Sequence, residues 1–400
     1  MKKEELCDII GDIDERHISN ATRKKARIPV ITKIAVAAVL AVIAVGAGAF
    51  LISEEKPPVD PYADLQPITL SGITFAHGME VLDAYDVSEL VSGNPWTEDA
   101  PITDLPVFRN YLGYSEEMHK AIGADKDKMM SALLDAAERL GIKEEELTIT
   151  DNGVPEEKQA EMLEKMGGYV PEGFFELNML YGENDDVRII VYSDLEVDIN
   201  FKEPISLPEE YNFDHYASLE DTAAVAEYFK AAYAHLIKMD SPQTDINGGD
   251  YNIYLEQSYS IAFYDAGGDI IDGILNYNFK KVEFWGYDNQ LRGVRIYDTD
   301  ISGVEGQYPI ITPEEAKELF AEGHYATSVM GYEAKAENIK KIELVYRADD
   351  TDAFFIPYYR LLVEIETEKE SGINTYGAYY VPAIKSEWIT NMPTYDGSFN

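Results

Sequence analysis

One uninterrupted apolar run limits what this chain can fold into and where it can lie. Residues Ile34 to Ile52 read IAVAAVLAVIAVGAGAFLI, 19 residues without a charged side chain. A helix rises about 1.5 Å per residue, so a run of this length nearly crosses a hydrocarbon core of about 30 Å. The sequence therefore predicts a transmembrane helix at 34–52.

The charges on either side of the run predict its orientation. Between Arg16 and Lys33 there are six basic residues and no acidic one, whereas Glu54 and Glu55 follow the run directly. Basic residues stay on the cytoplasmic side of a membrane helix. We therefore expect a single-pass cell-membrane protein with residues 1–33 as a basic cytoplasmic segment and the bulk of the chain extracellular.

Cleavage of the same run as a signal peptide is the alternative. Ala47-Gly48-Ala49 has the small-x-small character of a signal-peptidase site, and cleavage there would release a secreted protein. Against it, the segment before the run is 33 residues long, and the run continues past the site through Ile52. The sole cysteine, Cys7, lies far before the run and does not suit a lipoprotein anchor. These features favour an uncleaved anchor.

The charge balance excludes one class of partner. The chain has 33 Lys and Arg against 74 Asp and Glu, a formal net charge of -41. Nucleic-acid binding depends on neutralising phosphates with basic residues, so no nucleic-acid partner is expected. A solvated acidic surface is the simpler explanation of this charge, and a surface that binds cations or cationic peptides is the alternative.

The remaining chain divides into a stalk and two predicted lobes. Residues 53–67 contain four prolines among charged residues and read as an extended stalk. Folded sequence begins near Ile68, with an α+β lobe at 68–205 and another at 206–400, the latter alternatively two units at 206–305 and 306–400. A helix followed by several strands recurs three times. This order favours α+β units in which a helix packs on a curved, antiparallel sheet.

Three helices carry clear end signals. Asp125 caps a helix predicted to end at Leu140, with Gly141 directly after it, and Ser218 opens a second helix. Thr312-Pro313-Glu314-Glu315 opens a third helix as a capping box, and Gly323 ends it.

Strand patterns follow each helix. The runs 187–192 and 194–201 have the composition and alternation of strands, as do the final three runs at 339–347, 354–366 and 375–384. Between 251 and 298, several Tyr-, Ile- and Val-rich runs are separated by turn residues at Gly248-Gly249, 265–269 and Asp288-Asn289.

The residues do not point to a catalytic, cofactor or metal site. No nucleophile elbow, phosphate loop or dinucleotide fingerprint is present, and the single thiol excludes a multi-cysteine site. No two of the six histidines stand at helical metal-site spacing with a nearby carboxylate: His17, His77, His119, His215, His235 and His324. The acidic stretches 265–272 and 298–300 lack the calcium-loop pattern, so we expect hairpin turns there, with weak calcium binding as the alternative.

Tyrosine is abundant, with 28 residues in the chain. On strands, this favours cross-strand aromatic packing, and a peptide- or glycan-binding platform is the alternative.

Both ends of the chain resemble regulatory membrane proteins. The opening MKKEELCDIIGDIDERHISNATRKKARIP and the apolar run resemble anti-sigma-factor-like single-pass proteins of Gram-positive bacteria. The segments ITPEEAKELFAEGHY, IELVYR, FFIPYYRLLVEIE and YGAYYVPAI resemble the C-terminal regions of PepSY-like and YycH/YycI-type envelope regulators. The resemblance implies a non-catalytic extracytoplasmic domain on a signalling tether, and it transfers no catalytic or ligand residue.

Together, these features predict a membrane-anchored regulator or sensor and not an enzyme. Its outer region would bind a ligand, a peptide or another envelope protein. The N-terminal segment would either dock a cytoplasmic regulator or lie on lipid headgroups, through Leu6, Ile9, Ile10, Ile13 and Ile18. The alternative function is a surface hydrolase or cell-wall-modifying enzyme that uses carboxylates the sequence does not identify.

Overall fold

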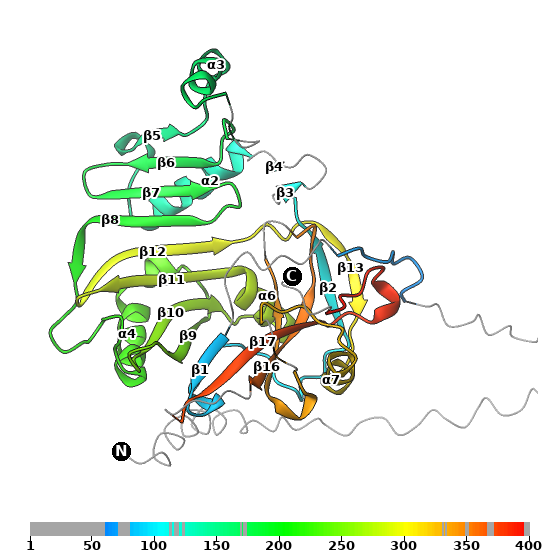
Figure 1. The fold of residues 1–400 in the computed structure, drawn as a ribbon. Helices are drawn as coiled ribbons and strands as arrows, with labels where there is room; N and C mark the ends of the chain where they lie inside the picture. Colours follow the sequence, from blue (N-terminus) through cyan, green and yellow to red (C-terminus); the bar gives the residue numbers. More distant parts are fainter. Residues whose placement is uncertain are drawn as a thin grey trace, which may run out of the picture. The chain divides into compact units, whose positions relative to one another are not determined.

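The computed structural model describes residues 61–70, 81–111, 114–115, 120–121, 125–168, 170, 174–329, 332, 334–348, 352–365 and 372–395. Residues Asp60–Asn400 form one compact unit. Within it, the described residues adopt an α+β fold with mostly antiparallel sheets (Figure 1), which confirms the α+β, antiparallel part of the predicted fold class.

The predicted membrane helix at 34–52 lies outside the described residues. So do the segment at 1–33 and the first part of the stalk. Among the helices that the structure describes, none is long and apolar enough to cross a membrane.

The largest sheet has eight strands in the order β5-β6-β7-β8-β12-β11-β10-β9. Its strands are β5 (Thr148–Asp151), β6 (Met179–Glu183), β7 (Val187–Tyr192), β8 (Val197–Ser206), β9 (Pro242–Tyr251), β10 (Gln257–Asp265), β11 (Lys280–Tyr287) and β12 (Gln290–Asp298). The neighbours β8 and β12 lie mainly on opposite sides of the boundary predicted at 205/206. Backbone hydrogen bonds therefore join the two predicted lobes in one sheet, and the domain limits themselves stay a prediction.

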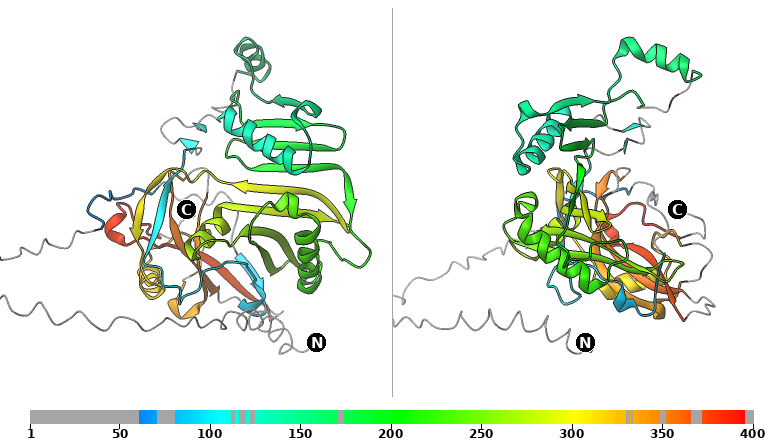
Figure 2. Two further views of the ribbon diagram at one scale, coloured as in Figure 1. Left: turned by 180° about the vertical axis from the view of Figure 1, so that it is seen from behind. Right: turned by 90° about the vertical axis from the view of Figure 1, so that its left-hand side faces the viewer.

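Two long helices, α2 (Lys126–Arg139) and α4 (Leu219–Ala232), cover one face of this sheet, as the left view of Figure 2 shows. The short helix α5 (Ala234–Ile237) follows α4. Alternate strand side chains point toward the helices and form one buried core, which includes Ile189, Ile199, Phe263, Phe284, Val294, Leu133 and Phe229. Because side chains alternate along a strand, the opposite face carries the polar positions.

The predicted caps of these helices are confirmed. The Asp125 carboxylate accepts hydrogen bonds from the amides of Asp127 and Lys128, both at 3.0 Å. Gly141 follows α2 with a φ of 72°, a left-handed conformation that glycine adopts without strain. The Ser218 hydroxyl accepts from the Asp221 amide at 3.1 Å, which satisfies one of the unpaired donors at the start of α4.

A second sheet has four strands in the order β1-β17-β16-β14. They are β1 (Val81–Ala84), β14 (Ile339–Tyr346), β16 (Pro357–Ile365) and β17 (Asn374–Pro382). The smaller sheets contain β13 (Val304–Pro309), β2 (Asp104–Arg109) and β15 (Phe354–Phe355) in one, and β3 (Tyr114–Ser115) and β4 (Lys120–Ala121) in the other. The strands predicted near the C-terminus are therefore confirmed.

The remaining helices are α3 (Glu156–Lys165), α6 (Ile270–Phe279) and α7 (Pro313–Ala321). The predicted capping box of α7 is confirmed: the Thr312 amide donates to the Glu315 carboxylate at 2.7 Å, and the Glu315 amide donates to the Thr312 hydroxyl at 3.2 Å.

Three local predictions are wrong. The stretch 298–300 is not a hairpin turn, because it leads from β12 to β13, which belong to different sheets. The stretch 265–272 is not a hairpin turn, because Asp269 accepts from the amides of Ile271 and Asp272 and caps α6. Gly248 and Gly249 do not form a turn between strands but lie inside β9, with φ values of 137° and 100°, beside a register shift in the pairing with β10. In contrast, Asp288 and Asn289 form the predicted two-residue turn, with φ values of 55° and 56°.

Candidate functional site

Two polar clusters involve the face of the eight-stranded sheet opposite α2 and α4, and one of them also includes side chains of the four-stranded sheet. Strand register produces the other, because Arg295 on β12 stands opposite Glu283 on β11 and Asp198 on β8. We call the first the junction cluster (Ser92, Asp245, Lys281, Glu343 and Arg360). The second is the Arg295 cluster (Tyr192, Glu196, Asp198, Glu283, Arg295 and Tyr297).

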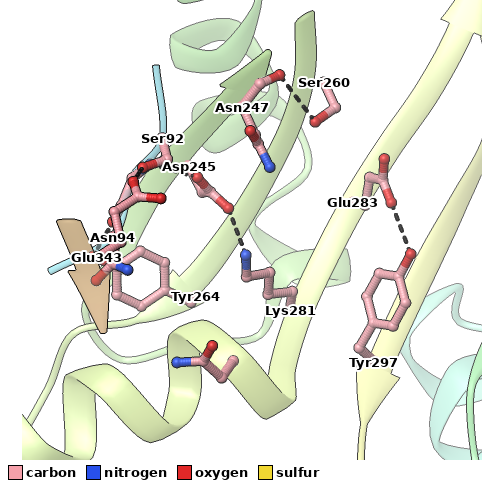
Figure 3. Close-up of polar contacts among 12 residues, drawn as sticks. Ser92, Asn94, Asp245, Asn247, Ser260, Tyr264, Lys281, Glu283, Tyr297 and Glu343 are labelled. Atoms are coloured by element: carbon pink, nitrogen blue, oxygen red, sulfur yellow. Dashed lines mark hydrogen bonds and ion pairs between the residues drawn. The ribbon is translucent and has the colours of Figure 1, made fainter. Parts of the chain in front are cut away.

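The junction cluster lies where residues 89–93 pass between the two main sheets. Val91 forms a bridge with Gly248 of β9, and the Gly93 amide donates to the Asp245 carboxylate at 2.7 Å. The Ser92 hydroxyl donates to the Glu343 carboxylate of β14 at 2.6 Å. Figure 3 shows Ser92, Asp245 and Glu343 side by side. The segment 89–93 therefore joins both sheets through hydrogen bonds.

Glu343 is only 4 % exposed but remains ionised. Burial alone would raise the pKa of this carboxyl. The opposing field of Arg360 and Lys341, with hydrogen bonds from Ser92 and Arg360, instead lowers the pKa of Glu343 to about 2. A buried carboxylate with so many donors is fixed in place and has little capacity to move a proton near neutral pH.

Asp245, 2 % exposed, is paired as completely as Glu343. Lys281 donates to it at 2.6 Å, and the same ammonium group lies 3.7 Å from the centre of the Tyr277 ring. Burial raises the pKa of Tyr264 to about 12, and its hydroxyl donates to the Gly93 carbonyl at 3.0 Å. The charges of the junction cluster are thus paired within each sheet, Asp245 with Lys281 and Glu343 with Arg360.

The Arg295 cluster differs because it is partly exposed and has more acids than bases. The Arg295 Nε lies 2.9 Å from a Glu196 oxygen and 2.8 Å from an Asp198 oxygen. The Tyr297 hydroxyl donates to Glu283 at 3.0 Å, and the Tyr192 hydroxyl donates to Asp198 at 3.2 Å. The side chains of Arg295 and Glu196 are 39 % and 25 % exposed. One guanidinium therefore pairs with two carboxylates, Glu196 and Asp198, while the third, Glu283, stands opposite Arg295 on the neighbouring strand.

Burial, together with this imbalance, shifts the ionisation of Glu196. Burial raises its pKa to about 7, the neighbouring carboxylates add to the rise, and Arg295 opposes it. The carboxylates that contribute are Asp194, Asp198 and Glu283. Near neutral pH, Glu196 therefore exchanges a proton readily, and an added positive charge beside it would favour the ionised form.

A pocket of about 250 Å³ lies near the ends of β11 and β12. Four cations line it, each within 4 Å of a carboxylate: Arg139 with Asp135, Lys238 with Asp135 and Glu138, Lys280 with Asp298, and Lys281 with Asp245. Since each positive charge is already paired, the pocket offers no clear anion site.

The structure places the other residues considered from sequence in structural roles. Asp265 accepts hydrogen bonds from the amides of Asp240, Ser241 and Gly267, while Asp300 pairs with Lys128 at 2.5 Å. In the part of the chain that the structure describes, no three His, Cys, Asp or Glu side chains are placed to hold a metal ion. Cys7, His17, His77 and His119 lie outside the described residues.

Most tyrosines of the core strands pack as predicted. Tyr308, Tyr346, Tyr358, Tyr359, Tyr376, Tyr379 and Tyr380 are all buried. Their hydroxyl groups reach backbone acceptors where the core requires it, as in the 2.7 Å bond from Tyr359 to the Ile311 carbonyl. The packing interpretation is therefore confirmed for these residues, while Tyr192 and Tyr297 take part in the Arg295 cluster.

The chain matches no protein-family model, and no curated protein matches it. The geometry and the sequence are therefore the basis for any functional conclusion.

Proposed function

We propose that the protein is a single-pass, membrane-anchored extracytoplasmic binding protein of envelope signalling, and that the Arg295 cluster binds a cationic peptide ligand. The uncharged run 34–52 and the basic residues before it support the anchor and the orientation. A non-catalytic role agrees with the sequence, which carries no catalytic motif.

The observation that carries the proposal is a cluster of three carboxylates with a single guanidinium, which pairs with two of them, on a partly exposed sheet face. Glu196, Asp198 and Glu283 retain negative charge that Arg295 does not neutralise. A ligand ammonium or guanidinium group would supply the missing charge, and the net charge of -41 would attract it from a distance. The rings of Tyr192 and Tyr297 add aromatic surface beside the carboxylates, suited to cation–π contact.

A titration with a peptide of fixed charge tests this proposal. The probe is acetylated tetralysine amide, whose side chains stay protonated from pH 6 to pH 8. If binding requires ionised Glu196, affinity should rise by up to about tenfold over that interval, because the pKa of Glu196 is about 7. Calorimetric titration of the full chain in detergent measures it.

Two variants separate this site from the general acidic surface. Glu196→Gln should bind more weakly at pH 8 and lose the pH dependence. Glu227→Gln is the matched control. Glu227 is an exposed residue of α4, which lies on the opposite face of the sheet from the Arg295 cluster. Equal binding by Glu196→Gln and the unaltered chain would show that the peptide interacts with diffuse surface charge, and the proposed site would be wrong.

The hydrolase alternative rests on the same residue. A carboxyl group with a pKa near 7 beside an ionised carboxylate is the arrangement that a general acid requires. Release of soluble fragments from purified cell wall by the full chain, and its loss in Glu196→Gln, would favour the enzyme over the binding protein.

A further inference from the structure

The loop between β9 and β10 exposes three consecutive large apolar side chains. Ile253 is 88 % exposed, Tyr254 75 % and Leu255 53 %. Hairpin turns usually carry Gly, Asn or Asp, which need no apolar partner. A contiguous apolar tip of this kind marks an interaction surface and contributes little to the fold, because most of its apolar surface is exposed in the described structure.

The loop is held in one shape by its own hydrogen bonds. The Asn252 side-chain oxygen accepts from the amides of Tyr254 at 2.8 Å and Glu256 at 3.0 Å, and the Leu255 amide donates to the Asn252 carbonyl at 3.0 Å. The Asn252 amide in turn donates to the Glu256 carbonyl at 3.0 Å. The amides of residues 254–256 are therefore satisfied within the loop. An apolar medium requires such internal pairing, whereas water does not.

The anchor proposed above would hold the folded unit near a bilayer. Eight residues, 53–60, separate Ile52, the last residue of the apolar run, from Pro61, the first described residue. A chain of that length spans at most about 30 Å. Tethering at such short range would raise the effective concentration of the folded unit's exposed apolar groups at the membrane, which favours even a weak apolar contact.

We propose that the Ile253–Leu255 tip inserts into the interface of the bilayer that carries the anchor. This inference rests on the membrane anchor proposed above. Tyrosine is suited to the boundary between headgroups and acyl chains. Asp250 and Glu256 flank the tip with negative charge, so insertion depends on apolar contact and is weaker where anionic lipid is abundant. The tip is narrow and convex, which suits penetration of lipid better than a broad protein interface of 20 to 30 residues a side.

Fluorescence of the full chain in phosphatidylcholine vesicles tests the insertion. In a Cys7→Ser background, Tyr254→Cys is labelled with an environment-sensitive fluorophore, and doxyl-labelled lipid is the quencher. We expect a blue shift and quenching at position 254. The matched control is Tyr216→Cys, because Tyr216 is also an exposed tyrosine, at 54 %, and it should show neither change. Adding Ile253→Ser and Leu255→Ser should remove the quenching, and adding phosphatidylglycerol should reduce it.

Vesicle flotation distinguishes failure of the anchor from failure of the tip. A chain that does not float with the vesicles is not anchored, and both proposals are then wrong. A chain that floats but shows no quenching at position 254 overturns the tip proposal alone. A blue shift without quenching would mean that the loop is covered by protein, such as a second copy of the chain, and would also overturn it.

Discussion

The charge of Glu196 depends on its surroundings near neutral pH. Its ordinary carboxyl pKa of 4.5 rises to about 7, so the folded protein holds this proton more tightly than the unfolded chain does. The favourable contribution is present in full below about pH 4.5 and is lost as the pH rises through 7. For a shift of this size, the upper limit is about 3 kcal/mol.

We expect Glu196→Gln to be more stable than the unaltered protein at pH 8, because glutamine mimics the protonated carboxyl. The difference should shrink toward pH 5, where Glu196 is itself protonated. Thermal unfolding at both pH values measures it, with Glu227→Gln as the control. A variant that is equally destabilised at both pH values would show that the ion pair with Arg295 outweighs the cost of burying the charge.

Lys281 stabilises the junction cluster by neutralising the negative charge of Asp245. Substitution by methionine keeps the length of the side chain but leaves a carboxylate that is 2 % exposed without its cation. We expect Lys281→Met to destabilise the protein by about 3 kcal/mol, since removing one partner of a buried ion pair leaves an uncompensated charge. Chemical denaturation measures the change. The double variant Lys281→Met with Asp245→Asn should recover much of the loss, and failure to recover would indicate that Lys281 acts through packing on Tyr277.

At the scale of elements, α7 depends on its first turn. Thr312 and Glu315 satisfy each other's amides, and this reciprocal pairing lowers the pKa of Glu315 through hydrogen bonds from Thr312. The helix also places Ala316 and Phe320 in the core against the four-stranded sheet. Loss of the cap is therefore expected to weaken the packing of the C-terminal region.

We expect Thr312→Ala to lower the free energy of unfolding by about 1 kcal/mol, the usual effect of removing a capping hydroxyl. Thr312→Ser keeps the hydroxyl and should remain near the unaltered value. Denaturant titration followed by circular dichroism compares the two variants. An unchanged midpoint for Thr312→Ala would contradict the role of the cap.

The β9–β10 hairpin and α6 show where structure predicted from neighbouring residues differs from the fold. The Asp-rich stretch 265–272 has the composition of a turn, but tertiary packing buries Ile274 and Phe279 of the following residues and favours a helix. The glycines at 248 and 249 read as a turn because turns favour glycine. In the fold they allow the backbone at Glu89 to pass close to β9, since a Cβ at Gly249 would lie 2.0 Å from the Glu89 carbonyl oxygen.

At the scale of the whole molecule, the predicted topology places Cys7 in the cytoplasm. A membrane-impermeant maleimide should leave the full chain unlabelled in intact cells and label it after permeabilisation. Denaturation after permeabilisation controls for burial of the thiol. Labelling in intact cells would invert the orientation. Recovery of a chain that begins near Phe50 would establish cleavage and make the protein a secreted one.

The sequence by itself determined the features that depend on neighbours along the chain. The caps at Asp125, Ser218 and Thr312 follow from residues two or three positions apart, and the α+β class follows from periodicity. The tertiary structure alone decided the Arg295 cluster, because its residues run from 192 to 297 and meet only through the pairing of β7, β8, β12 and β11. A carboxylate in an acidic chain has no distinguishing mark in sequence. The burial of Glu196 and its ion pair with Arg295 come from the pairing of these strands, and both set the pKa of Glu196.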